Sequence, residues 1–243
     1  MNPQQKLHPL VWLGIVLGGS FLIATLLGAF TLFRIRAQGD VVSVTGSAKM
    51  QVTSDQAKWT TQISRSVRES TLKSGYDQLA RDLEGAKSFF AGQGITEAEM
   101  TISPINMYEV YEQNQPVDKR YTLSQTITVQ SSDVAKVTRA SNAIGTVAGK
   151  GIIFSSLSLE YYYSKLPESR IALLSQAIDD AKARAKELAK NSGNTIGKLK
   201  SASSGVVQVQ SLNSTDISDY GMYDTSQIEK QITVTVKATF SLK

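Results

Sequence analysis

The chain has 243 residues, a mass of 26.4 kDa and a formal net charge of +5, with no cysteine and one histidine. The lack of cysteine excludes a thiol nucleophile, a thiolate zinc site, a cysteine-ligated iron–sulfur cluster and a disulfide. Because the one imidazole, His8, precedes a long apolar run, a Ser-His-Asp triad or a histidine metal site in the folded part is also excluded. Lys6, Arg34 and Arg36 flank that run, and the remaining charges nearly balance, so no basic stripe indicates nucleic-acid binding.

The apolar run covers residues 10–33 and contains no charged side chain. A helix of this length spans roughly 36 Å, which is enough for a hydrocarbon core about 30 Å thick. Trp12 near one end, and Arg34 and Arg36 after the other, suit the two membrane interfaces. We predict an uncleaved transmembrane anchor preceded by a tail over residues 1–9. A cleaved signal peptide is the alternative, although its apolar part usually has only about 7–15 residues.

Small residues recur along this segment at helical spacing. Gly14 and Gly18 form a GxxxG pair, and Ser20, Ala24 and Gly28 repeat every four residues. Because small side chains let two helix backbones approach closely in a membrane, we predict helix packing through these positions. The alternative is that these residues have no such role, since glycine and alanine are common in membrane spans.

Two signals for the orientation of the anchor disagree. Lys6 on one side and Arg34 and Arg36 on the other lean slightly towards a cytoplasmic C-terminal part under the positive-inside rule. The 28 Ser and 18 Thr of residues 38–243 instead favour an extracytoplasmic domain.

After a linker over residues 34–40, apolar residues alternate over 42–52 and 57–63, which predicts an opening hairpin with its turn at 53–55. An apolar stripe from Leu72 to Phe90 predicts a helix that ends near Gly92. Two strands are predicted next, at 101–111 and 120–130, and Pro104 indicates an edge or a bulge in the first.

A second helix is predicted over 134–148, followed by a strand over 152–163. The third helix begins near Pro167, and its predicted buried stripe has six members: Ile171, Leu174, Ile178, Ala181, Ala185 and Leu188. Strands at 196–212 and 227–242 complete the order ββ-α-ββ-α-β-α-ββ. The clean alternation of the last strand predicts antiparallel sheets with helices on one side, so we interpret residues 41–243 as one two-lobed α+β domain.

No set of side chains in this domain points to catalysis. The loop 213–224 contains Asp216, Asp219 and Asp224, but their spacing does not match a calcium-binding EF-hand loop. We expect a solvated loop, no metal, no cofactor and no enzymatic activity.

Four tyrosines are the candidates for a subunit interface: Tyr108, Tyr111, Tyr121 and Tyr162. Exposed tyrosines on strands are common where proteins meet. The alternative is that these rings cover the open face of a sheet or pack beneath loops.

Five segments in this order resemble the SIMPL-domain (YggE-like) family: 42–48 (VSVTGSA), 54–59 (SDQAKW), 94–95 (GI), 100–104 (MTISP) and 189–193 (AKNSG). The resemblance implies a bacterial envelope protein with an α/β fold, a tendency to form large ring-like or channel-like homo-oligomers, and a loose link to stress responses. It implies no catalytic residues. Many members begin with a cleaved signal peptide, and an uncleaved anchor departs from that pattern.

We therefore expect a homo-oligomeric scaffold, anchored in the bacterial inner membrane by one helix, with its C-terminal domain in the periplasm. Its expected partners are the lipid bilayer, other copies of the chain and an unidentified envelope protein, and not nucleic acid. The alternative is an extracytoplasmic module that binds an apolar ligand or a protein partner.

Overall fold

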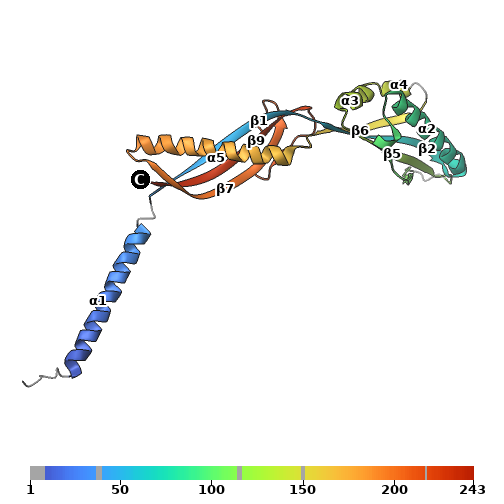
Figure 1. Ribbon diagram of the computed structural model, residues 1–243. Helices are drawn as coiled ribbons and strands as arrows, with labels where there is room; N and C mark the ends of the chain where they lie inside the picture. Colours follow the sequence, from blue (N-terminus) through green and yellow to red (C-terminus); the bar gives the residue numbers. More distant parts are fainter. Residues whose placement is uncertain (1–8, 37–39, 114–116, 149–150, 217) are drawn as a thin grey trace, which may run out of the picture. The chain divides into compact units, whose positions relative to one another are not determined.

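The computed structural model describes residues 9–36, 40–113, 117–148, 151–216 and 218–243 (Figure 1). It confirms the predicted fold class, because an apolar helix precedes an α+β part with two sheets rich in antiparallel pairs. Most of the predicted N-terminal tail and residues 37–39 of the predicted linker lie outside the described residues. The chain divides into two compact units. Unit 1 comprises Met1–Ser47, Gln176–Gly205 and Thr235–Lys243, and unit 2 comprises Ala48–Ser175 and Val206–Val234.

The first element is α1 (Pro9–Arg36), a helix of 28 residues. Its three hydroxyl side chains donate hydrogen bonds to carbonyls one turn earlier in the helix: Ser20 to Leu17, Thr25 to Phe21 and Thr31 to Leu27, at 2.7–2.9 Å. These bonds satisfy the polar groups of an otherwise apolar segment, as a lipid environment requires.

Unit 2 contains a five-stranded sheet of order β3-β5-β2-β6, in which β4 also pairs with β5. Its strands are β2 (Gln56–Arg68), β3 (Met100–Ile102), β4 (Asn106–Val110), β5 (Arg120–Ser131) and β6 (Ile153–Tyr162). All these pairs are antiparallel, and the central ladder joins β2 to β5 from Ala57↔Ser131 to Arg68↔Arg120.

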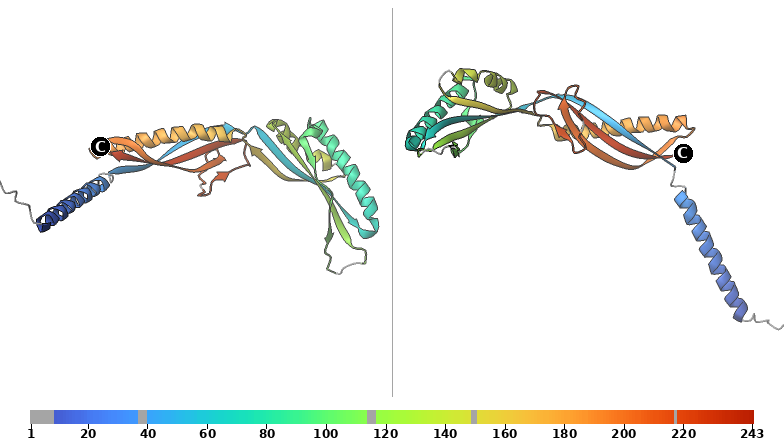
Figure 2. Two further views of the ribbon diagram at one scale, coloured as in Figure 1. Left: turned by 60° about the horizontal axis from the view of Figure 1, so that its bottom comes forward. Right: turned by 180° about the vertical axis from the view of Figure 1, so that it is seen from behind.

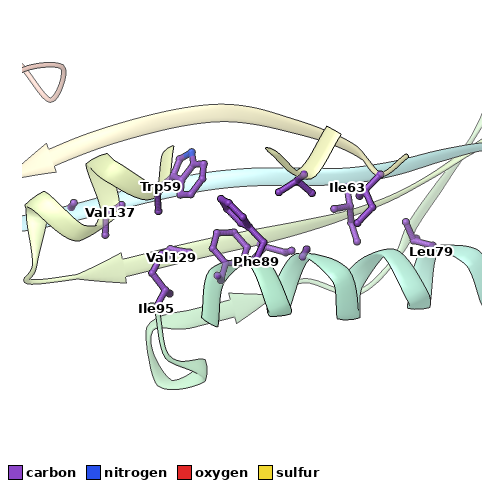
Figure 3. Close-up of a cluster of buried hydrophobic side chains, with 14 of the residues drawn as sticks. Trp59, Ile63, Leu79, Phe89, Ile95, Val129 and Val137 are labelled. Carbon is purple, nitrogen blue, oxygen red and sulfur yellow. The ribbon is translucent and has the colours of Figure 1, made fainter. Parts of the chain in front are cut away.

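Helices α2 (Leu72–Gly92), α3 (Val134–Asn142) and α4 (Gly145–Ala148) cover one face of this sheet (Figure 2), and the short 3-10 helices η1 (Glu69–Thr71) and η2 (Glu97–Glu99) precede α2 and β3. The core of unit 2 lies between these layers and includes Trp59, Ile63 and Phe89 (Figure 3). Phe90 meets Trp59 edge to face with ring centroids 5.6 Å apart. The Trp59 indole N–H donates to Ser156 Oγ at 2.9 Å, so its polar group is satisfied in the core.

The second sheet has the order β1-β9-β7-β8, and β1, β7 and β9 contribute to both units. Its strands are β1 (Val41–Thr53), β7 (Ile196–Ser211), β8 (Met222–Tyr223) and β9 (Glu229–Leu242). In unit 1, α5 (Leu166–Asn191) packs on this sheet very closely at Gly46, where an added Cβ would lie 2.5 Å from the backbone nitrogen of Ala181.

The predicted opening hairpin is wrong, because β1 and β2 belong to different sheets. The turn between them bonds to other segments instead: the Ser54 N–H donates to Ile228 O at 2.9 Å, and the Asp55 N–H donates to Tyr162 O at 3.0 Å. Alternation in the sequence correctly indicated two strands, but it carries no information about which strand pairs with which.

The predicted buried stripe of α5 is also partly wrong. The structure buries Leu173, Ala177, Ala181, Ala185 and Ala189, whereas Ile171 and Leu188 are 72% and 53% exposed. Around Ala177 and Ala181 the cause is the close approach of the sheet at Gly46, which leaves room there for alanine methyl groups but not for larger side chains.

Three smaller differences remain. The predicted second helix is two helices, α3 and α4, and the predicted strand over 101–111 is interrupted around Pro104 to give β3 and β4. The two-residue β8, which pairs in parallel with β7, was not predicted. The alternation of the last strand is confirmed by five buried residues of β9: Ile232, Val234, Val236, Ala238 and Phe240.

Candidate functional surfaces

Helix α1 exposes an apolar surface along its described side chains. Leu10–Leu32 is long and apolar enough to cross a membrane, and no part of it is buried against the rest of the chain. Large exposed side chains such as Trp12 and Phe21 are costly in water and favourable in lipid.

The predicted helix-packing residues lie within this surface. Apart from the adjacent residues and the backbone of the helix itself, no described atom comes within 4 Å of the place where a Cβ would stand at Gly14, Gly18 or Gly28. Ser20 and Ala24 are likewise exposed in the single chain. These positions are therefore open to another helix, and their role in association stays a prediction.

The outer edge of β7 is a second exposed feature. Residues 198–206 of this strand are exposed on both faces. Its outer neighbour β8 pairs only with Gln208 and Val209, so no strand among the described residues pairs with this edge before residue 208. The backbone N–H and C=O groups that point outward there are available to another strand.

Strand β6 forms one edge of the five-stranded sheet. Its C-terminal end is covered, since the Tyr161 N–H donates to Thr225 O at 2.8 Å. No described strand pairs with the outer side of residues 153–159, a segment with the sequence IFSSLSL and no charge. Ile153 and Leu157 are 52% and 55% exposed there, and Leu157 occupies the register shift between β2 and β6.

The structure separates the four predicted interface tyrosines into two places. Tyr108 and Tyr111 are exposed on and just after β4, and Tyr121 is half-buried on the paired strand β5. Tyr162 pairs with Gln56 at the opposite end of β2 from Val67, the partner of Tyr121. These two β2 positions are eleven residue steps apart, which corresponds to about 36 Å of strand, so the four rings do not form one patch.

Tyr162 belongs to a small aromatic cluster. Its ring lies 5.9 Å from that of Tyr223, and burial, followed by the charge of Glu160, raises the pKa of its phenol. The Tyr223 hydroxyl accepts a hydrogen bond from the Tyr163 N–H at 2.8 Å.

A fully buried lysine that the sequence did not predict, Lys230, lies beside this cluster. Its ammonium group donates to the carbonyls of Asp224 and Gln227 and stands 5.8 Å from the centre of the Tyr223 ring. Burial lowers the pKa of Lys230, while the charge of Asp224 opposes that shift. In the sequence, Lys230 lies within the alternating strand, two residues before Ile232 and on the same face as the buried residues of β9, so the alternation marks this position even though lysine is rarely buried.

Two further ion pairs stabilise unit 2. Arg65 on β2 donates twice to Asp82 on α2, which is buried. Glu99 accepts bonds from Lys136, Ser131 and the Thr96 N–H, and these bonds lower its pKa to about 2. Both pairs join a helix to the sheet or to its flanking turns, which is a structural arrangement and not a reactive one.

The described residues contain no group of three or more His, Asp or Glu side chains placed to hold a metal ion. An open hollow of about 500 Å³ lies beside the start of α2, lined by polar groups such as Arg68, Ser74, Gln78 and Arg120. Arg68 and Arg120 both pair with Glu112, so their charge is partly neutralised there.

A family model named SIMPL, described as a protein of unknown function (DUF541), matches residues 42–240. The chain belongs to the SIMPL family. The match covers the two sheets and begins after α1, so it does not extend to the apolar helix. No curated protein matches the chain. The SIMPL description names no activity.

Proposed function

We propose that the protein is a membrane-anchored scaffold that works by assembling with copies of itself, without a catalytic step. The observation that carries this proposal is the open, uncharged edge of β6 at residues 153–159. An open edge presents a row of unsatisfied backbone donors and acceptors, which another extended strand satisfies by continuing the sheet.

The β6 edge lacks the usual protection against such pairing. Natural proteins guard open edges with lysine, proline or inward-pointing charges. Residues 153–159 contain none of these and expose two large aliphatic side chains, Ile153 and Leu157. An edge of this kind is a liability in a monomer, and a second copy that covers it removes that liability.

The anchor and the compartment complete the proposal. We propose that α1 is retained as a single membrane span, with both units on the periplasmic side of a bacterial inner membrane. The length and apolarity of Leu10–Leu32 support the span. Several copies held in one bilayer by their own anchors raise one another's local concentration, which favours assembly through weak edges.

The test is the native mass of the full chain in detergent, measured by light scattering. The edge variant combines Ile153→Lys with Leu157→Lys, and its matched control combines Ile171→Lys with Leu188→Lys on the exposed side of α5. All four side chains are more than half exposed, so neither variant disturbs a core. We expect a defined multimer for the wild type and the control, and a smaller species for the edge variant.

A monomeric wild type would refute assembly and would favour the binding-module alternative. A multimer that both variants leave intact would refute the β6 edge as its interface.

A further inference from the structure

The two units carry charges of opposite sign. Unit 1 contains eleven Lys and Arg and four Asp and Glu, a net charge of +7, whereas unit 2 contains fifteen basic and seventeen acidic residues, a net charge of −2. Unit 1 includes α1, so the excess of basic residues belongs to the unit that carries the proposed membrane anchor.

Hydrogen bonds gather separate parts of unit 1 at one end of its sheet. The Leu242 N–H donates to Asp40 O at 2.8 Å, and Thr195 and Lys243 exchange two backbone bonds of 2.8 Å. The end of α5 is held there too, because Asn194 N–H donates to Ala189 O at 2.8 Å, with Gly193 in a left-handed turn at φ +77°.

This end of unit 1 is tethered close to the membrane by chain length alone. From Arg36, the last residue of α1, to Val41, the first of β1, the chain advances five residues. Five residues reach at most about 18 Å when fully extended. If α1 spans the bilayer, the sheet end that contains Asp40 therefore stays within that distance of the end of the helix.

Four lysines lie on or near that end. Lys190 is in the last turn of α5, Lys198 and Lys200 are on the first part of β7, and Lys243 follows β9. All four are exposed, and none forms an ion pair with another residue that the structure describes. Asp40 and Glu187 are the acidic residues of this region, so the positive charge exceeds the negative.

We propose that this basic end, formed by Lys190, Lys198, Lys200 and Lys243, binds the headgroups of anionic lipids next to the point where α1 leaves the bilayer. The inference rests on the proposed membrane anchor. Lysine is a flexible point charge that suits phosphate headgroups, and juxtamembrane basic clusters are attracted to anionic leaflets within a Debye length of about 8–10 Å. Because the short connection to α1 holds this end next to the bilayer, lipid headgroups are present there at a high local concentration. A soluble anion or a nucleic acid has no such advantage.

The absence of cysteine makes a single-site label straightforward. Asn194→Cys, an exposed position at the basic end, carries a fluorophore in the full chain. The protein is reconstituted in vesicles of phosphatidylcholine alone, or with about one third phosphatidylglycerol, and both leaflets contain a lipid with a nitroxide quencher on its headgroup. We expect at least twofold stronger quenching in the anionic vesicles, and loss of that difference in high salt, because salt screens the attraction.

The lysine variant changes Lys198, Lys200 and Lys243 to Gln, and its matched control changes three exposed lysines of unit 2, Lys49, Lys73 and Lys165, to Gln. The first should lose the extra quenching and the second should keep it.

Equal quenching in the two vesicle types, or equal behaviour of the two variants, would overturn the proposal. Quenching that depends on protein density and not on lipid charge would also overturn it, in favour of a contact between proteins. A carbonate wash separates the two hypotheses: release of the protein refutes the anchor, whereas retention without charge-dependent quenching refutes the lipid contact alone.

Discussion

Gly46 is the position at which one added methyl group should disturb unit 1 most. A Cβ there would lie inside contact distance of Ala177 O, 2.5 Å from Ala181 N and 2.7 Å from Ala181 Cβ. Comfortable contacts between such atoms are about 3.5 Å, so the helix would have to retreat by roughly 1 Å. Because two of the obstructing atoms belong to the backbone of a 26-residue helix, no side-chain rotation relieves the clash.

The expected cost follows from this geometry. Overpacking a close contact costs about 1–3 kcal/mol, and the retreat also loosens the buried alanines of α5. We therefore expect Gly46→Ala to destabilise the packing of α5 in unit 1 by about 3 kcal/mol, which corresponds to roughly a hundredfold increase in its opening equilibrium.

Hydrogen exchange of the full chain in detergent, followed by mass spectrometry, measures the opening of α5 directly. Peptides from residues 176–191 should lose about two decades of protection in Gly46→Ala. The matched control is Gly92→Ala in α2, where nothing lies within 4 Å of the added Cβ and alanine should stabilise the helix by about 0.5–1 kcal/mol. Unchanged exchange of α5 in Gly46→Ala would refute the close contact and the explanation of the alanine stripe.

Three further predictions concern unit 2 and can be checked by urea unfolding, followed by the fluorescence of the fully buried Trp59. Glu99 has a pKa of about 2 in the folded chain, compared with an ordinary value of 4.5, so the stability that its charged form contributes is complete above pH 4.5 and is lost as the pH falls to about 2. Over that range the free energy of unfolding of the wild type should fall by about 2 kcal/mol more than that of Glu99→Gln. Equal losses would contradict the role of the Glu99 bonds. Lys230→Met leaves two carbonyls unpaired and should destabilise unit 2 by about 2 kcal/mol, whereas an unchanged midpoint would mean that these bonds contribute nothing. Arg65→Ala or Asp82→Ala should each cost about 3–5 kcal/mol, and the double variant should cost less than their sum; simple additivity would show that the pair is not coupled.

Most elements of the fold could be predicted because one face of each sheet is buried. In such a strand, apolar and polar residues alternate, and β9 from Ile232 to Phe240 follows this rule. Helix α2 was predictable for the same reason, since Leu79, Ala86 and Phe90 recur on one side of it. In both cases burial of one face of the element produces a periodic pattern of apolar residues within that stretch of the sequence.

What could not be predicted depends on residues that are distant in the sequence. Neighbouring strands usually pair, and the short turn between β1 and β2 gave no sign that β1 instead lies beside β9. The stripe of α5 was misplaced because hydrophobicity favours Ile171 and Leu188, whereas the helix buries the face on which Ala177 and Ala181 meet Gly46. The hydrogen bonds of the buried Lys230 ammonium group could not be predicted either. Its acceptors are the backbone carbonyls of Asp224 and Gln227, which belong to a loop without a recognisable motif.

The net positive charge of unit 1 could not be predicted from the sequence either, and it matters for the proposed lipid contact. Unit 1 consists of three segments that are separate in the sequence. Its excess of basic residues is therefore spread along the chain and becomes apparent only when the three segments are counted together. The uncharged β6 edge lies in unit 2, whereas the unpaired lysines lie in unit 1. If assembly uses the first and lipid contact uses the second, the two should separate cleanly: Ile153→Lys with Leu157→Lys should reduce the native mass and leave lipid quenching intact, and the triple lysine variant should do the reverse. A variant pair that altered both properties together would show that membrane contact and assembly depend on one surface.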